Sequence, residues 1–187
     1  ILEAIHWKPA ISWMIDKIHV LRPIKFESIR RNELGGKISA SKVSGAIKRK
    51  STQDLYMVIE EDRQQRASTV LKDVGYIIEA HVVLTDKAGE EDNLMKHVEM
   101  FKRRANKGQC FHQPCMGVRE FPAAFALLSD DAVLPESALG TTEINRDLGW
   151  MLHDIDFENG ALPRFFRAKL ENGVINIPHF AAEEVKS

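Results

Sequence analysis

The sequence predicts an α+β fold, because helical and strand patterns occupy separate stretches of the chain. A helical pattern covers residues 94–106, while the alternating apolar residues that are typical of strands cover residues 11–32 and 76–84. After residue 108 only strand patterns remain. With 187 residues, of which 44% are hydrophobic, the chain is long enough to bury a core.

The first seven residues have helical spacing, with Ile1, Leu2 and Ile5 on one side, and Pro9 ends the helix. The run is typical of the end of a helix, so we expect the natural protein to begin upstream. His6 falls in the last turn, where the helix dipole favours a protonated imidazole. A helix-end histidine without any chemical role is the alternative.

Residues 11–32 are predicted to form two strands or one bent strand, because Pro23 interrupts the alternation. Residues 35–50 are rich in Gly, Ser and Lys, and we expect a mobile basic loop that is either a solvated linker or a phosphate contact. A short strand is predicted at 55–60, and a longer one at 76–84.

Four arginines stand near the ends of these segments, as the pair Arg30 and Arg31 and as Arg63 and Arg66, which enclose two glutamines. The guanidinium groups of Arg63 and Arg66 offer bidentate contacts to phosphates and base edges, as in the recognition of single-stranded RNA. Surface ion pairs of little energetic value are the alternative.

The helix at residues 94–106 is predicted with Asn93 as its N-cap and Gly108 just beyond its end. Apolar residues recur on one side of this helix at helical spacing. The stripe consists of Leu94, Val98, Phe101 and Ala105.

Beside the stripe lies a basic face that spans an arc of about 120°. It comprises Lys96, His97, Met100, Arg103, Arg104 and Lys107. Lys96 and His97 stand in the first turn, where cations oppose the helix dipole. Departures from a local rule concentrate at functional sites, although the acidic residues 90–92 could simply offset the charge.

Beyond Gly108 the apolar period is two. Strands are predicted at residues 111, 116–121, 123–128 and 148–157, with a loop at 129–146. Asn172-Gly173 lies between the apolar runs 164–170 and 174–177, which is the strongest short signal of a β-hairpin. The tail from Ala181 is expected to be frayed.

The order of these elements predicts a ferredoxin-like (RRM-like) domain of the split βαβ type at residues 1–108. Its first strand and the start of its first helix are expected upstream of Ile1. Residues 109–187 are predicted to form an antiparallel β-rich C-terminal extension.

No metal or other cofactor is expected. Cys110 and Cys115 flank His112, but a zinc site needs about four ligands and no second pair has suitable spacing, so we expect reduced structural thiols. Asp154 and Asp156 share one strand face, yet this pair lacks the further oxygen ligands of a divalent-metal site, and surface carboxylates are expected.

The net charge of −1 requires that any nucleic-acid binding come from local basic patches. No apolar run approaches the length that spans a membrane, and the start has no signal-peptide pattern. The cytoplasm is therefore the expected compartment.

Lys96 and His97 also suit a metal-free ribonuclease site. Cutting RNA without a metal needs a base for the 2′-hydroxyl proton, a cation near the phosphorane oxygens and an acid for the leaving 5′-oxygen. His97 suits the base, since its first-turn position and Lys96 both disfavour the imidazolium. A solvated Lys-His pair on a surface helix is the alternative.

Several long runs together resemble one known family. They are AIHWKPAISWMIDKIHVLRPI, RQQRASTVLKDVGYIIEAHVVLTD, KHVEMFKRRANKGQCFHQPCMGVREFPA, GWMLHDIDF and FFRAKLENGVI. The chain resembles the CRISPR-associated repeat-processing endoribonuclease of subtype I-C (Dvulg type), a member of the RAMP superfamily. The resemblance covers nearly all of the chain apart from the loops at 35–50 and 129–146.

The resemblance implies a ferredoxin-like domain with a β-rich C-terminal extension, and metal-independent cutting of precursor CRISPR RNA at the base of the repeat hairpin. It also implies retention of the 5′ handle, with the other subunits of the subtype I-C interference complex as partners and a monomer when free.

The family's catalytic set corresponds to His6, Lys96 and His97. Many relatives carry tyrosine in place of His6, and phenol and imidazole differ by about 3.5 units in reference pKa. Our hypothesis is that His6 supplies a proton and His97 takes one.

RNA contacts are expected from three cations of the helix and five further arginines. They are Arg103, Arg104 and Lys107, followed by Arg30, Arg31, Arg63, Arg66 and Arg119. One alternative function is a non-catalytic RNA-binding subunit of the interference complex. Another is a metal-dependent nuclease, for which Asp154 and Asp156 are the visible candidates.

Overall fold

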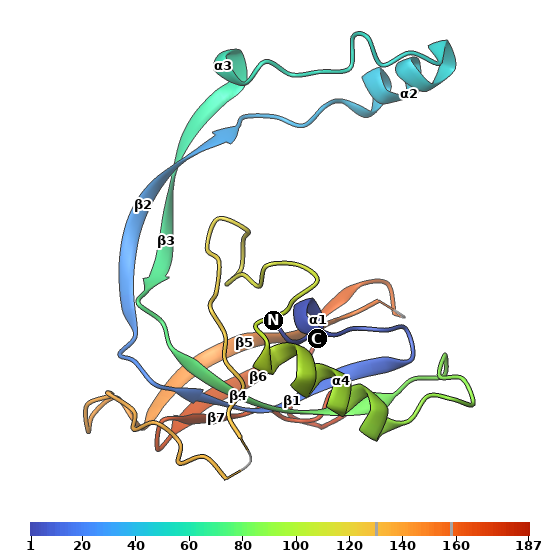
Figure 1. The fold of residues 1–187 in the computed structure, drawn as a ribbon. Coiled ribbons are helices and arrows are strands. Elements are labelled where there is room, and N and C mark those ends of the chain that lie inside the picture. Colours follow the sequence, from blue (N-terminus) through green and yellow to red (C-terminus); the bar gives the residue numbers. More distant parts are fainter. Residues whose placement is uncertain (130, 158) are drawn as a thin grey trace. The chain divides into compact units, whose positions relative to one another are not determined.

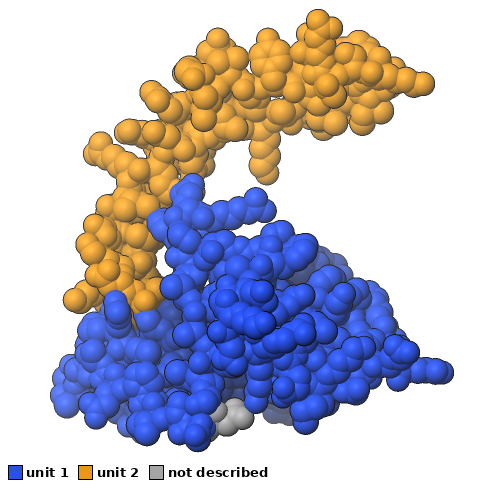
Figure 2. All heavy atoms as spheres, in the orientation of Figure 1, with its two compact units in different colours: residues 1–23, 75–187 blue, residues 24–74 orange. Residues whose placement is uncertain are grey.

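The computed structural model describes residues 1–129, 131–157 and 159–187. The chain forms two compact units, which are coloured separately in Figure 2. Unit 1 comprises residues 1–23 and 75–187, and unit 2 comprises residues 24–74. Both contain antiparallel strands with few helices, so the predicted α+β class is confirmed (Figure 1).

Unit 1 is built on a five-stranded antiparallel sheet with the strand order β4-β1-β7-β6-β5 (Figure 1). The strands are β1 (Ile11–Val20), β4 (Tyr76–Leu84), β5 (Arg146–Asp156), β6 (Leu162–Glu171) and β7 (Val174–Asn176). Ile18 of β1 pairs with Ile175 of β7, so strands from both sides of residue 108 share one sheet. The domain boundary at residue 108 stays a prediction.

Two helices of unit 1 position the site described below, α1 (Leu2–Ile5) and α4 (Leu94–Asn106). The bounds of α4 are those predicted. The Asn93 side chain accepts a hydrogen bond from the Lys96 main-chain N–H at 2.8 Å, which caps the first turn. Gly108 has a φ of +63°, the left-handed conformation that commonly follows the end of a helix.

The buried face of α4 differs from the predicted stripe. Its buried residues are His97, Phe101 and Ala105, whereas Leu94 is 45% exposed. The Trp13 ring of β1 packs against Phe101 with ring centroids 4.6 Å apart. The helix is therefore rotated so that His97, predicted on a basic surface face, points into the protein.

The Asn172-Gly173 hairpin between β6 and β7 is confirmed. Both residues have positive φ, at 51° and 79°, as a two-residue type I′ turn requires. Glycine supplies this conformation without steric cost, and asparagine is among the few other residues that tolerate it.

The end of the chain is docked on unit 1, so the predicted frayed tail is wrong. Val185 is 3% exposed and belongs to a core cluster that includes Phe166 and Leu170. Lys186 pairs with Phe165 as an isolated bridge. Burying a valine side chain stabilises by roughly 1.5 kcal/mol or more, which opposes the entropy cost of ordering the end of the chain.

Unit 2 consists of a two-stranded antiparallel ribbon and two helices (Figure 1). They are β2 (Lys25–Leu34), α2 (Ala40–Arg49), α3 (Ile59–Asp62) and β3 (Arg63–Lys72). The interruption predicted at Pro23 is confirmed, since β1 and β2 are separate strands.

Two predictions for unit 2 are wrong. The expected mobile loop at residues 35–50 contains α2, whose N-cap Ser39 accepts a hydrogen bond from the Lys42 main-chain N–H at 3.3 Å. The strand expected at 55–60 is absent among the described residues, and α3 begins at Ile59 instead. The acidic run that follows Ile59 favours a first helical turn.

The strands predicted between Phe111 and Leu128 are also wrong. In this described segment the structure has one isolated bridge, between Cys115 and Pro122. Phe125 and Leu127 pack against the core cluster of α1 and α4 instead of pairing with a strand, whereas Phe111 is 79% exposed. Short apolar runs fit both environments, so periodicity alone does not separate them.

The loop predicted at 129–146 lacks helix and strand in its described residues up to Asn145, and β5 begins at Arg146. Asp130 lies outside the described residues. No helix in the described part of the chain is both long and apolar enough to cross a membrane.

Candidate active site

The site lies where α1 ends beside the start of α4. His6 follows α1 in an extended conformation, and its carbonyl oxygen accepts a hydrogen bond from the Trp13 indole at 2.9 Å. The preceding carbonyl, of Ile5, accepts from Arg104 Nη1 at 3.0 Å. The carbonyl of Ala4 accepts from the Phe111 N–H at 2.6 Å. Three consecutive carbonyls are thereby fixed, which holds the His6 side chain in place.

His6 and His97 form a buried hydrogen-bonded pair. The Nε2 atom of His6 lies 3.1 Å from Nδ1 of His97, and the stacked rings have centroids 5.4 Å apart. The residues are 0% and 2% exposed. The structure therefore brings together two of the three predicted catalytic residues, although 91 positions separate them in the chain.

Asp92 contacts the other side of the His97 ring. Its Oδ1 atom lies 3.1 Å from His97 Nε2, and its Oδ2 atom accepts a hydrogen bond from the Gly89 N–H at 3.0 Å. From the sequence, Asp92 is expected only as one of three acidic residues that offset basic charge. The signal that could have found it is its place directly before the N-cap Asn93, next to the first helical turn that contains His97.

Lys96, the third predicted catalytic residue, approaches the same carboxylate from the solvent side. Its Nζ atom is 3.9 Å from Asp92 Oδ1 and 3.3 Å from the Glu91 carbonyl oxygen. The Lys96 side chain is 44% exposed. An exposed ammonium group thus lies next to the carboxylate that contacts the buried imidazole pair.

The environment sets the charge states of the site. Burial lowers the pKa of His6, and the positive charges of Arg104, His97 and Lys8 lower it further. The prediction that the helix end favours a cationic His6 is therefore wrong, because α1 is a single turn and burial outweighs its dipole. The hydrogen bond from the Gly89 N–H, followed by those of His97 and the Lys96 charge, lowers the pKa of Asp92.

The remaining predicted RNA contacts of unit 1 are distributed around α4 and the segment after it. Arg103, Lys107 and Arg119 are exposed. Arg104 is half-buried and holds the Ile5 carbonyl, so one of its N–H groups is already bonded. RNA binding by all four stays a prediction.

The predicted contacts of unit 2 lie on both faces of the β2–β3 ribbon. Arg31 pairs directly with Arg66, and both reach Glu33, at 3.6 and 3.8 Å. Arg30 and Arg63 lie on the opposite face, where Arg30 pairs with Ala67 and Arg63 pairs with Leu34, further along the ribbon. Glu33 offsets part of the positive charge on the first face, so the face of Arg30 and Arg63 is the better suited to phosphates.

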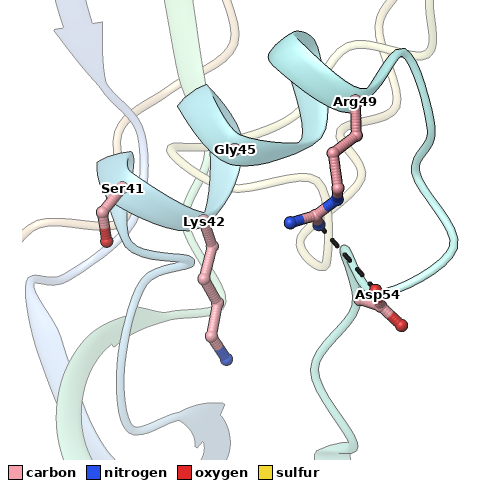
Figure 3. A pocket seen from close by; sticks show the side chains of 5 residues that line it. All are labelled: Ser41, Lys42, Gly45, Arg49 and Asp54. Atoms are coloured by element: carbon pink, nitrogen blue, oxygen red, sulfur yellow. Dashed lines mark ion pairs between the residues drawn. The ribbon is translucent and has the colours of Figure 1, made fainter.

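Unit 2 also carries a basic pocket of about 450 Å³ beside α2 (Figure 3). Lys42 and Arg49 extend from one side of the helix, and Gly45 between them has no side chain to fill the space. Arg49 reaches Asp54 at 3.8 Å. Both partners are mostly exposed, so this ion pair is weak and leaves the guanidinium able to contact an anion.

Among the described residues, no group of three or more His, Cys, Asp and Glu side chains is arranged to hold a metal ion. Cys110 and Cys115 are free thiols. Asp154 accepts a hydrogen bond from the Ile155 N–H, and Asp156 accepts hydrogen bonds from Asn159. Both of these candidate metal ligands therefore accept hydrogen bonds from neighbouring residues of the chain.

Comparison with known proteins gives one family. The family model for CRISPR-associated proteins of the Cas5d type matches residues 1–178. The chain is 73% identical over 186 residues to the CRISPR pre-crRNA endoribonuclease Cas5d of Mannheimia succiniciproducens, covering 100% of this chain and 83% of that protein. It is 36% identical over 197 residues to the protein of the same name from Thermus thermophilus, covering 95% and 76%.

Two solved structures share the fold. A crystal structure of a CRISPR-associated protein matches with a TM-score of 0.66 and 21% identity, covering all of this chain and 80% of the other. A functionally uncharacterized protein of Streptococcus mutans matches equally well, with 81% of its chain covered.

Proposed function

The chain belongs to the Cas5d family of CRISPR-associated proteins, and from this membership we propose that it is an endoribonuclease that cuts precursor CRISPR RNA. Two relatives bear the name of that activity, one of them at 73% identity over nearly the full chain. The observation that carries the proposal is the buried His6–His97 pair with the Lys96 ammonium beside it.

The chemistry requires that a proton leave a 2′-hydroxyl as its oxygen attacks the adjacent phosphate, and that a proton reach the departing 5′-oxygen. A lowered pKa keeps His6 neutral near pH 7, so the pair begins the reaction ready to accept a proton. This reverses the division of labour expected from the sequence, in which His6 supplied the proton. Lys96 places its charge where the phosphorane oxygens become more negative.

Substrate must reach imidazoles that are closed off from solvent in the RNA-free protein. Cys110, Phe125 and Leu127, from the segment after α4, pack against the core beside α1. The proposal therefore requires RNA binding to move part of the structure around His6, and this neighbouring segment is the candidate.

The substrate we propose is the CRISPR repeat hairpin, cut at the base of its stem, with the 5′ handle retained and the chain acting as a subunit of the subtype I-C interference complex. The free protein is proposed to be a monomer. Basic residues in both units support RNA binding, with the exposed Arg103 and Lys107 closest in sequence to the candidate site.

The test is to incubate the purified protein with repeat RNA in EDTA. We expect one discrete cut near the stem base, with a 2′,3′-cyclic phosphate on one product. RNA with a single 2′-deoxy nucleotide at the cut position should bind but remain intact. Tight binding without cutting would support the non-catalytic RNA-binding subunit instead, and cutting that needs added magnesium would support a metal-dependent nuclease.

Variants assign the residues. His6→Ala and His97→Ala should each abolish cutting, and Lys96→Ala should slow it by about 10²- to 10³-fold, the usual cost of removing one group that stabilises developing charge. His179→Ala is the matched control, because His179 is an exposed histidine outside the pair and outside the segment after α4. Equal losses in His179→Ala would mean that the assay reports folding and not the site.

A further inference from the structure

A carboxylate closes one end of the histidine pair. Asp92 Oδ1 lies 3.1 Å from His97 Nε2, and His97 Nδ1 lies 3.1 Å from His6 Nε2. The three side chains form one continuous row of hydrogen bonds, which runs from the start of α4 to the end of α1. The sequence resemblance and the comparisons assign no role to Asp92.

The carboxylate dictates the tautomers along this row. A carboxylate oxygen only accepts hydrogen bonds, so His97 must carry its proton on Nε2. Neutral His97 then has a lone pair on Nδ1, which accepts from Nε2–H of His6. His6 is left with a lone pair on Nδ1. In the opposite tautomer of His97, the lone pair of Nε2 would face the Asp92 carboxylate, and the two would repel each other.

The far end of the row is a buried nitrogen without a partner. Nδ1 of His6 is inaccessible to solvent and makes no hydrogen bond to any residue that the structure describes. Buried polar atoms are nearly always bonded, so an exception calls for a functional explanation. The tautomers above make this atom a basic nitrogen, which is what an incoming hydroxyl group needs.

We propose that Asp92 is a positioning residue that makes Nδ1 of His6 the atom that receives the 2′-hydroxyl proton, an inference that rests on the proposed function. As that proton binds Nδ1, the proton on His6 Nε2 passes to His97 Nδ1. His6 ends neutral, and His97 becomes an imidazolium with both nitrogens protonated. Return of the same proton along the row supplies the departing 5′-oxygen, so no proton is gained or lost.

The charges around the pair favour this direction of transfer. Arg104 and Lys8 place positive charge near His6 and oppose a cation there. Asp92 contacts His97 and stabilises a cation on that ring. Lys96 lies 3.9 Å from the same carboxylate but is exposed, so solvent weakens its opposing effect.

The inference is tested with Asp92→Asn, which removes the charge and leaves one oxygen, so that it can accept from His97 or from the Gly89 N–H but not from both. We expect single-turnover cutting to fall by about 10²- to 10⁴-fold, the range for a lost acid–base contribution, with RNA affinity unchanged. The acidic limb of the pH–rate profile should move to lower pH, because the imidazoles lose the neighbouring anion. Asp92→Glu should restore part of the cutting rate and return the acidic limb of the pH–rate profile toward its wild-type position.

A second measurement does not depend on activity. The ¹⁵N chemical shifts of the His97 ring in the full chain should show the Nε2–H tautomer in the wild type and a mixture in Asp92→Asn. Asp86→Asn, which alters an exposed carboxylate in the turn before α4, is the control.

The outcomes separate the two claims. A wild-type protein that does not cut repeat RNA overturns the proposed function, and the role of Asp92 with it. A wild-type protein that cuts, together with an Asp92→Asn variant of unchanged rate and pH profile, overturns the role of Asp92 alone. A slower Asp92→Asn variant whose pH limb and His97 tautomer are unchanged also overturns it, because that pattern indicates a general structural effect.

Discussion

Arg104 donates from Nη1 to the main-chain carbonyl oxygen of Ile5 at 3.0 Å, one residue before His6. This hydrogen bond, like the one between His6 and His97, joins α4 to the end of α1, and it lies in a half-buried position. Arg103, its neighbour in the helix, is exposed. Two adjacent arginines that look equivalent in the sequence therefore have different roles.

Arg104→Ala should lower the free energy of unfolding by about 1 to 2 kcal/mol, because it leaves the Ile5 carbonyl without its charged donor. Arg103→Ala, the matched control, should change it by less than about 0.5 kcal/mol, as is usual for exposed positions. Urea unfolding monitored by tryptophan fluorescence measures both. Equal midpoints for the two variants would contradict a structural role for Arg104.

Replacing Arg103 and Lys107 together by alanine should weaken RNA binding at low salt and flatten its salt dependence. Each phosphate contact that is lost should reduce the slope of log K against log salt by about 0.7 for single-stranded RNA. Filter binding at several salt concentrations gives the slope. Lys169→Ala, an exposed lysine on β6, is the comparison, and an unchanged slope in the double variant would place the RNA elsewhere.

Stability should fall as the pH falls below the ordinary histidine pKa of 6.5. The pKa of His6 is lowered in the folded protein, so below 6.5 the unfolded chain binds more protons at this residue and is favoured. The stabilisation that neutral His6 contributes is present above pH 6.5, and it is lost as the pH drops through the lowered pKa of His6 in the folded protein. His6→Gln should show a smaller decline in urea midpoint over this range.

Asp92 does not interfere with that measurement. Its pKa is lowered from 3.8, so its own contribution is lost only in more acidic solution. A decline in His6→Gln that equals the wild-type decline would mean that His6 is not buried as a neutral imidazole.

Histidine acylation by diethyl pyrocarbonate should follow exposure. His81, His112 and His179 are exposed and should react first, whereas His6 and His97 should react only slowly in the RNA-free protein. Peptide mass spectrometry over a time course gives the order. Rapid modification of His6 would show that the pair is open in solution and that no segment has to move for RNA to enter.

Features that depend on neighbouring residues were predictable from the sequence. Asn93 and Gly108 mark the ends of α4 because a cap and a left-handed glycine act within one turn of the chain. The Asn172-Gly173 turn is equally local, and its two positive φ angles follow from the residue types. The residues of the histidine pair were identified from the family resemblance, whereas their contact with each other is a tertiary property.

Features that depend on tertiary packing were not predictable. The rotation of α4 that buries His97 arises because Trp13 and Phe101 pack together. The two residues are far apart in the chain, so the sequence pattern does not predict their contact. The same rotation places His97 within hydrogen-bond distance of Asp92. The helix at α2 was missed because glycine, serine and lysine dominate its composition, although Ser39 provides an ordinary N-cap.

The β1–β4 pair has a consequence for how this protein can vary. Val20 pairs with Tyr76, and the Leu21 N–H bonds to the Gly75 carbonyl at 2.9 Å, so all of unit 2 occupies the place of a hairpin turn. Closing a flexible loop costs only about 0.6 kcal/mol more for each doubling of its length. Mutation and selection can therefore lengthen, shorten or recompose this insertion while the residues that hold the histidines stay unchanged. The insertion and the framework that holds the histidine pair can in this sense evolve separately.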